Sequence, residues 1–198
     1  MNNNLFDDLA KKYDSKERVF LANKIQNRVY LELDDSLEKI LLDYGSGTGL
    51  VSLNLTSMVN KVYLVDSSEE MTQITNHKIK DQEILNAKAL CHNLMTETLD
   101  LKADIILVSL VLLHIPDTQK ILEELYRRLN DHGKLIIVDF DLNDKINDSR
   151  VHNGFDKKQL ASQLTDAGFT NITAETFYQG EKIFMKEDAS LCLTVGYK

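Results

Sequence analysis

The stretch Lys39–Leu50, KILLDYGSGTGL, decides the fold. An apolar run ends at Asp43, and three glycines then follow on alternate positions, Gly45, Gly47 and Gly49. A buried strand that ends in glycines lets the backbone approach a ligand closely, and a following helix presents free amides at its N-terminus. The stretch therefore predicts a strand, a ligand-binding loop and a helix.

Other types of glycine loop fit this stretch less well. A nucleotide P-loop requires Gly-Lys-Ser/Thr, but Gly49 is followed by Leu50 and Val51. A dinucleotide loop requires Gly or Ala at the position of Leu50, where a large side chain would disturb the packing of helix on strand. A tight turn without a ligand would leave three glycines uncompensated, each at a cost of roughly 0.5–1 kcal/mol. The dinucleotide interpretation stays open as an alternative.

Apolar runs and helical stripes alternate along the rest of the chain. Helices are predicted after Asp14, as the capping acid, over Thr118–Asn130, and from Asp156 to a C-terminal Gly168. Alternation of strands and helices is typical of a parallel sheet that is covered on both faces. The predicted strands are 40–42, 62–65, 87–90, 105–108, 135–138, 172–177 and 191–195.

Length, charge and cysteine content limit the possible functions. A chain of 198 residues fits one domain, here 1–198. Its net charge of -8 would repel a phosphate backbone, so no nucleic-acid partner is expected. Cys91 and Cys192 lie far apart, which predicts neither a disulfide framework nor a metal site. No apolar stretch is long enough to cross a bilayer, so we expect a cytoplasmic protein without a membrane partner.

Several motifs together resemble the class I S-adenosylmethionine-dependent methyltransferases. Asp43–Gly49 is similar to the acid-x-Gly-x-Gly-x-Gly signature of that family, and Val65–Met71 to the end of its second strand. Further matches follow in the family's order, namely Cys91–Leu94, Asp104–Asp117, Leu129–Leu135 and Ala167–Phe169. The resemblance implies a doubly wound, Rossmann-like, seven-stranded α/β sheet with an antiparallel last strand and helices on both faces.

The resemblance also implies which residues bind the cofactor. Asp66, at the tip of the second strand, would accept hydrogen bonds from the two ribose hydroxyls. Asn93 stands where the family usually has an aspartate at the adenine, and its amide oxygen can still accept a hydrogen bond. The full predicted set is Tyr13, Asp43, Gly45, Ser46, Gly47, Asp66, Ser67, Asn93, Leu94 and Ser109.

Methyl transfer from a sulfonium is an in-line displacement, for which the protein mainly supplies alignment. A general base is needed only if the acceptor must lose a proton early, and His114 and His152 are the candidates. The patterns of nucleic-acid and arsenic methyltransferases are absent from the sequence. We therefore predict a methyltransferase that acts on a small-molecule acceptor, and the oligomeric state stays open.

Two other functions remain open at this stage. The chain could be a non-catalytic S-adenosylmethionine-binding protein or partner subunit, which keeps the glycine loop but transfers no methyl group. It could also be an NAD-dependent reductase, which would bind a different cofactor at the same loop.

The N-terminal region 1–35 is predicted to form a helical lid or cap. Phe6–Asp14 resembles the Phe-Asp-x-x-Ala-x-x-Tyr-Asp segment that precedes the core in many small-molecule members of the family. Phe6, Leu9 and Tyr13 are spaced to line one face of a short helix that would exclude water from the cofactor. Alternatively, the same stripe only docks the N-terminus on the domain.

Overall fold

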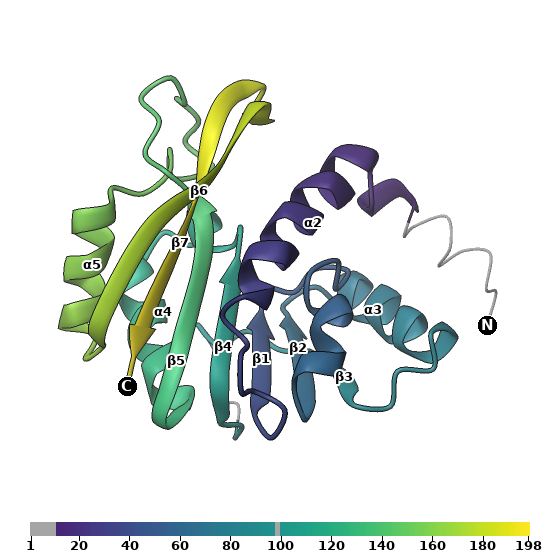
Figure 1. Ribbon diagram of the computed structural model, residues 1–198. Helices are drawn as coiled ribbons and strands as arrows, with labels where there is room; N and C mark the ends of the chain where they lie inside the picture. The colour runs from purple at the N-terminus through teal and green to yellow at the C-terminus, as the bar shows by residue number, and fades with distance from the viewer. Residues whose placement is uncertain (1–10, 98–99) are drawn as a thin grey trace. The chain divides into compact units, whose positions relative to one another are not determined.

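A computed structural model describes residues 11–97 and 100–198 of the chain. Within these residues, seven strands form one mixed sheet in the order β3-β2-β1-β4-β5-β7-β6 (Figure 1). The pairs β1–β2, β2–β3 and β4–β5 are parallel, whereas β7 is antiparallel to both β5 and β6. The prediction of a seven-stranded sheet with an antiparallel last strand is thus confirmed.

The chain divides between Asn93 and Leu94 into two compact units. The described residues of the first unit include three strands, the helices α2 and α3 and a 3-10 helix, and α3 packs against β2 and β3. The single domain predicted over 1–198 remains a prediction. The elements of the first unit are α2 (Lys16–Tyr30), β1 (Ile40–Tyr44), η1 (Ser52–Met58), β2 (Lys61–Asp66), α3 (Glu69–Asp81) and β3 (Ala87–Cys91).

Helix α2 begins one residue later than the predicted capping acid implies. Ser15 is the N-cap, and its hydroxyl accepts a hydrogen bond from the amide of Arg18 at 3.3 Å. The prediction of Asp14 as the cap is wrong because its carboxylate binds Thr48 and Lys78 instead. A serine satisfies the free amides of the first turn as well as an aspartate does, so the helix still forms.

The first unit has a continuous apolar interior because its parallel strands are covered by helices. Leu41 and Leu42 of β1 are fully buried, as are Val62 and Val65 of β2. Helix α3 is capped by Ser68, whose hydroxyl accepts from the amide of Met71, and the acidic side chains of its first turn complement the helix dipole. These elements fix the ends of β1 and β2, where the glycine loop lies.

In the part of the second unit that the structure describes, four strands, two α-helices and one 3-10 helix follow, and the core lies on the apolar runs of β4 and β5. Helix α4 packs against β5, and helix α5 packs against β6 and α4. The elements of this unit are β4 (Ala103–Ser109), η2 (Leu112–His114), α4 (Thr118–Arg128), β5 (Leu129–Phe140), α5 (Lys157–Asp166), β6 (Thr170–Phe184) and β7 (Glu187–Tyr197).

Helix α5 has the predicted ends, whereas α4 ends earlier than predicted. Helix α4 ends at Arg128, two residues before the predicted end, because Leu129 turns extended and pairs with Ala103. Helix α5 is capped by Asp156 as predicted, since its carboxylate accepts from two amides at 2.9 Å. Gly168 follows with a φ of 105°, which is the predicted C-terminal glycine.

Strands β6 and β7 form a hairpin that is longer than the predicted runs and projects beyond β5 in Figure 1. Its turn places Met185 and Lys186 at φ values of 52° and 69°, the left-handed conformation of a type I′ turn. The usual Asn-Gly signal is absent there, so the sequence did not reveal the turn. Stacking of Phe140 on Phe184, at 4.2 Å between ring centroids, fixes the hairpin to the end of β5.

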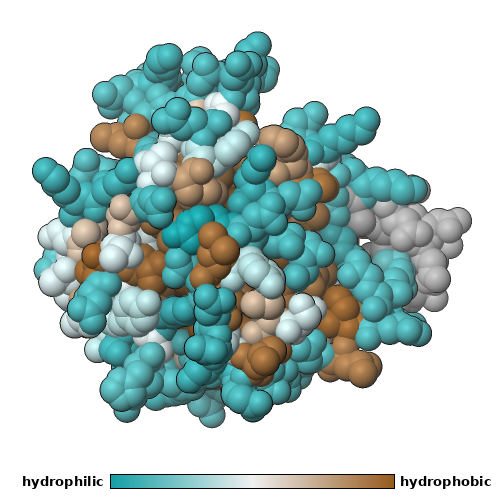
Figure 2. Space-filling model, viewed as in Figure 1, coloured by the Kyte–Doolittle hydropathy of each residue, from teal (hydrophilic) through white to brown (hydrophobic). Residues whose placement is uncertain are grey.

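The visible surface in Figure 2 is mostly hydrophilic, with hydrophobic residues in small separate groups. Among the residues that the structure describes, no helix combines the length and the apolar character needed to span a bilayer.

Candidate functional site

The glycine loop between β1 and η1 adopts a conformation that glycine favours. Gly45, Gly47 and Gly49 have φ values of 73°, 54° and 76°, in the left-handed region where a side chain is strained. The amides of Gly45 and Ser46 donate to the carbonyl of Val65 at 2.7 and 3.1 Å. The loop is therefore fastened to the end of β2, which pairs in parallel with β1.

Two of these glycines have different packing roles. A Cβ on Gly49 would lie 2.8 Å from Cγ of Leu53 and 3.2 Å from Leu64, so this glycine allows η1 to pack on β2. A Cβ on Gly47 would have no atom within 4 Å. Gly47 thus faces open space, and the loop backbone is accessible at this position to a ligand.

Asp66 lies at the end of β2 against the glycine loop. Its Oδ2 accepts from the amide of Gly47 at 2.8 Å, and its Oδ1 accepts from the amide of Ser68 at 2.8 Å. Each carboxylate oxygen has a second lone pair, so the half-buried side chain keeps acceptor capacity for a further donor. The structure thus brings together Asp66, Ser67 and Gly47, three of the predicted cofactor-binding residues.

Asp43 is buried beneath the loop, with 1% of its surface exposed. Its Oδ2 accepts a hydrogen bond from the Ser52 hydroxyl at 2.5 Å, whereas its Oδ1 has no hydrogen-bond partner among the described residues. Burial raises the pKa of Asp43 to about 7, and the nearby charge of Asp66 acts in the same direction. A buried acceptor without a partner is costly, which makes this oxygen a candidate for binding a donor from a ligand.

Sequence reasoning missed Ser52 and two further side chains that hold the loop. Thr75 donates its hydroxyl to the carbonyl of Gly47 at 2.9 Å, and Lys78 donates to the carbonyl of Thr48 at 2.8 Å. Both belong to α3, whose helical spacing gave no sign of this contact. A serine, a threonine and a lysine have no motif of their own, so only their positions in space assign the role.

The predicted adenine residue Asn93 follows β3 and is half-buried. The amide of the neighbouring His92 donates to the carbonyl of Asp66 at 2.9 Å. This bond ties the chain that leaves β3 to the end of β2, and Asn93 is the residue directly after His92. Its role at the adenine stays a prediction.

Tyr13 lies against the first turn of α3. Its hydroxyl donates to Oε2 of Glu70 at 2.8 Å, and this carboxylate raises the pKa of the tyrosine. The predicted contact of Tyr13 with the cofactor stays a prediction. Phe6 and Leu9, the other residues of the predicted stripe, lie outside the described residues.

In the second unit, Leu94 is buried and Ser109 ends β4. Leu110 follows with a φ of 55°, which is strained for a leucine, and its amide donates to the carbonyl of Val138 at 2.8 Å. Such a turn directs the chain sharply away from the end of the strand. The roles of Leu94 and Ser109 in binding the cofactor stay predictions.

Asp139, near the end of β5, is a second buried carboxylate that the sequence did not single out. It accepts from the amides of Phe140 at 2.9 Å and Leu113 at 3.2 Å, and 3% of its surface is exposed. Burial raises its pKa to about 7. Asp139 therefore holds the backbone of η2, the short element that contains His114.

The two histidine candidates have different environments. The ring of His152 bonds through Nε2 to the carbonyl of Ile115 at 2.8 Å, and its amide donates to the carbonyl of Leu113. Because a carbonyl only accepts, Nε2 carries the proton, which is typical of an anchoring histidine. His114 is exposed on η2, and desolvation lowers its pKa so that the ring is neutral at pH 7. A catalytic role for either stays a prediction.

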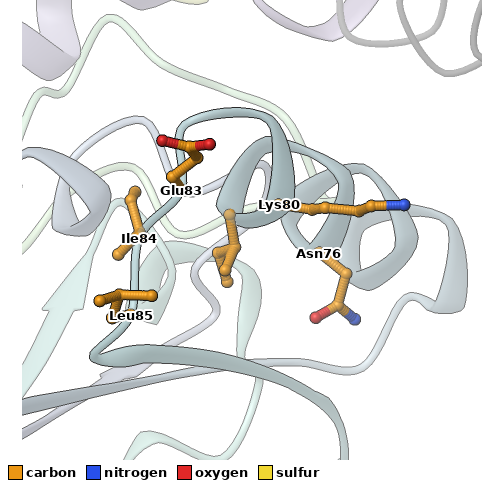
Figure 3. Close-up of a pocket in the computed structure, with 6 residues that line it drawn as sticks. Asn76, Lys80, Glu83, Ile84 and Leu85 are labelled. Carbon is orange, nitrogen blue, oxygen red and sulfur yellow. The ribbon is translucent and has the colours of Figure 1, made fainter.

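A separate hollow lies at the C-terminal end of α3 (Figure 3). It is open and lined by Asn76, Ile79, Lys80, Glu83, Ile84 and Leu85. None of these side chains belongs to the predicted cofactor set. Within residues 11–97 and 100–198, no group of His, Cys, Asp and Glu is arranged to hold a metal ion.

The sheet order, together with a glycine loop at the end of β1 that bonds to an acid at the end of β2, defines a Rossmann-like α/β protein. Comparison with known proteins identifies the family within this fold class. A family model described as "Methyltransferase domain" matches residues 35–186. The chain belongs to this family, and the predicted resemblance to class I S-adenosylmethionine-dependent methyltransferases is confirmed.

Individual relatives are distant. A demethylmenaquinone methyltransferase of Thermotoga maritima is 33% identical over 141 residues, which cover 68% of this chain and 59% of that protein. An uncharacterized methyltransferase of Schizosaccharomyces pombe is 26% identical over 132 residues, which cover 58% of this chain and 46% of that protein. The matches thus span only about half the length of these relatives.

Solved structures share the fold. A SAM-dependent methyltransferase from Aquifex aeolicus has a TM-score of 0.69 and 22% identity, and the match covers 100% of this chain and 98% of that one. This likeness confirms the Rossmann-like fold predicted from the sequence.

Proposed function

We propose that this protein is an S-adenosylmethionine-dependent methyltransferase that acts on a small-molecule acceptor. The main observation in support is the hydrogen bond from the amide of Gly47 to Asp66 at 2.8 Å, which joins the glycine loop to the acid at the end of β2. The methyltransferase family match over residues 35–186 supports the same reaction and the same cofactor.

The residues of the first unit fit this cofactor. Asp66 keeps lone pairs for the ribose hydroxyls, and Gly47 leaves open space beside the loop. The free Oδ1 of Asp43 is a buried acceptor that suits an ammonium group, and Gly45 and Ser46 would lie along the methionine portion. Asn93 would accept from the adenine amine. In the second unit, Leu94 and Ser109 complete the proposed set.

When bound, S-adenosylmethionine would supply an electrophilic methyl group, so the chain's own task is to bind and align. The protein needs no nucleophile of its own. His114 is the better candidate for a general base, since its ring is exposed and neutral near pH 7. His152 would instead hold the chain next to η2 through its bond with Ile115.

A small-molecule acceptor is supported by the Thermotoga relative, which is named for demethylmenaquinone. The net charge of -8 disfavours a nucleic-acid acceptor. We also propose a cytoplasmic location, in keeping with two cysteines that neither pair nor form a metal motif.

The proposal is tested by binding and turnover measured on the same protein. Calorimetry should show binding of S-adenosylmethionine and its demethylated product but not of NADH. Labelled methyl transfer should then be screened against pools of small metabolites, with Asp66→Ala as the matched negative control. Sulfonium binding without transfer to any acceptor would favour the non-catalytic binding protein, and NADH binding alone would favour the reductase.

We further propose that the N-terminal region 1–35 acts as a lid or cap over the cofactor. Tyr13 already lies on α3 through its bond with Glu70, close in sequence to the start of α2. If the region is a lid, amide exchange in residues 5–14 should slow when the cofactor binds. Equal protection with and without the cofactor, together with a large loss of stability on deletion, would assign the segment to the core instead.

A further inference from the structure

Three side chains from separate parts of the first unit meet at the glycine loop. Asp14, just before α2, places Oδ2 at 2.6 Å from Nζ of Lys78 on α3. The other oxygen of Asp14 accepts from the Thr48 hydroxyl at 2.5 Å. Lys78 also donates to the carbonyl of Thr48 at 2.8 Å. Thr48 is therefore held at both its side chain and its backbone.

This cluster is largely removed from solvent. The side chains of Asp14 and Lys78 are each 16% exposed, and 6% of Thr48 is exposed. A charge pair in such surroundings is screened little by water, and each charge depends on the other for its partner. Loss of one partner would leave the other buried without compensation, so the pair holds its geometry firmly.

The loop that the pair holds is rich in glycine, with Gly45, Gly47 and Gly49 on alternate positions. Gly47 and Gly49 flank Thr48 and have access to more backbone conformations than other residues, so an unrestrained loop would sample many of them. The carbonyl of Gly47 accepts from Thr75 and that of Thr48 accepts from Lys78, so α3 fixes two successive peptide units. The bond from Gly47 to Asp66 completes the restraint.

We propose that Asp14 and Lys78 are positioning residues of the cofactor site. They hold the glycine loop in its binding conformation and couple that loop to the residues that directly precede α2. This inference rests on the proposed function. Neither residue needs to touch the cofactor. Asp14 contributes its carboxylate from the residues just before α2, so a movement of those residues would act on the loop through the bond between Asp14 and Thr48.

The expected effect follows from the fraction of molecules whose loop is in the binding conformation. The apparent dissociation constant is the intrinsic constant divided by that fraction. If loss of the pair leaves about one molecule in ten with an ordered loop, the cofactor binds about tenfold more weakly. Turnover at saturating cofactor would fall much less, because bound cofactor selects the ordered loop.

The decisive variant is Lys78→Met, which keeps the chain length but removes the charge. Lys80→Met is the matched control, since Lys80 lies on the same helix, is exposed, and lines the separate hollow in Figure 3. Asp14→Asn is the second variant, because its amide oxygen can still accept from Thr48 while the charge is lost. Circular dichroism and thermal melting establish whether each variant is folded. If Lys78→Met does not fold, Asp14→Asn alone tests the positioning role.

Two measurements are made on each variant. Calorimetry with S-adenosylmethionine should give about a tenfold weaker Kd for Lys78→Met and an unchanged Kd for Lys80→Met. In the methyl-transfer assay, with an acceptor from the metabolite screen, Lys78→Met should change KM for the cofactor more than kcat. Amide exchange of residues 45–50 without any ligand should be faster in Lys78→Met and Asp14→Asn than in the control.

Equal Kd and equal loop exchange in Lys78→Met, Asp14→Asn and the control would overturn the positioning role. The exchange measurement needs no cofactor, so it judges this inference even if the wild-type protein does not bind S-adenosylmethionine. In that case the proposed function fails, while faster loop exchange in the variants would still support the lock.

Discussion

The buried carboxylate of Asp43 should make the stability of this protein depend on pH. Burial raises its folded-state pKa from 3.8 to about 7. In the unfolded chain the same group titrates near its ordinary value, so between these two pKa values the folded state binds the proton and the unfolded state does not. The free energy of unfolding therefore falls as pH rises through this window, and the contribution of protonated Asp43 is fully present only below it.

The magnitude follows from the width of the window. Each pH unit within it costs 1.36 kcal/mol per group, so a rise from 3.8 to about 7 corresponds to a loss of about 4 kcal/mol. Asp139 titrates over the same window and adds a similar slope. Replacing Asp43 by asparagine removes its contribution to the slope of unfolding free energy against pH, because the amide does not titrate. The contribution of Asp139 stays in place.

Urea unfolding followed by circular dichroism at several pH values tests this reasoning. Between about pH 5 and pH 7, the stability of Asp43→Asn relative to wild type should rise by about 2 to 3 kcal/mol. Asp131→Asn is the control, since Asp131 is exposed and its replacement should leave the wild-type slope unchanged. Parallel curves for Asp43→Asn and wild type would show that Asp43 is ionised in the folded protein, and would refute the reasoning.

Other substitutions at the site have separate expected results. Asp66→Ala should remove charge-assisted hydrogen bonds of about 1.5–3 kcal/mol and weaken cofactor binding at least tenfold by calorimetry; unchanged affinity would mean that the ribose lies elsewhere. Asn93→Asp should bind normally, because either side chain accepts from the adenine amine; lost binding by a folded variant would show that the amide donor matters. Gly49→Ala should lower stability in urea by about 2–4 kcal/mol, from backbone strain and the clash with Leu53. Gly47→Ala meets no neighbour and should cost only the strain, about 1–2 kcal/mol; equal losses would contradict the packing role of Gly49.

Local sequence patterns determined much of this fold. The apolar run before Asp43 predicted β1, and the capping pair at Asp156 predicted the start of α5. These features depend on residues within a few positions of one another, so a periodicity or a cap is readable without the rest of the chain. The family resemblance implied the doubly wound seven-stranded sheet and the antiparallel β7, which local patterns alone do not give.

Long-range contacts decided the features that local sequence patterns left open or predicted wrongly. Asp14 was expected to cap a helix, but Lys78 and Thr48 bind its carboxylate, and a neighbouring serine took the cap. Asp139 and Ser52 stood in no motif, yet each became part of a buried hydrogen-bonded group. The sequence by itself determined where strands, helices and the glycine loop lie, because these follow from neighbouring residues. Only the tertiary structure decided which charges are buried and which partners they find, because the free energy of a buried charge depends on groups that are distant along the chain.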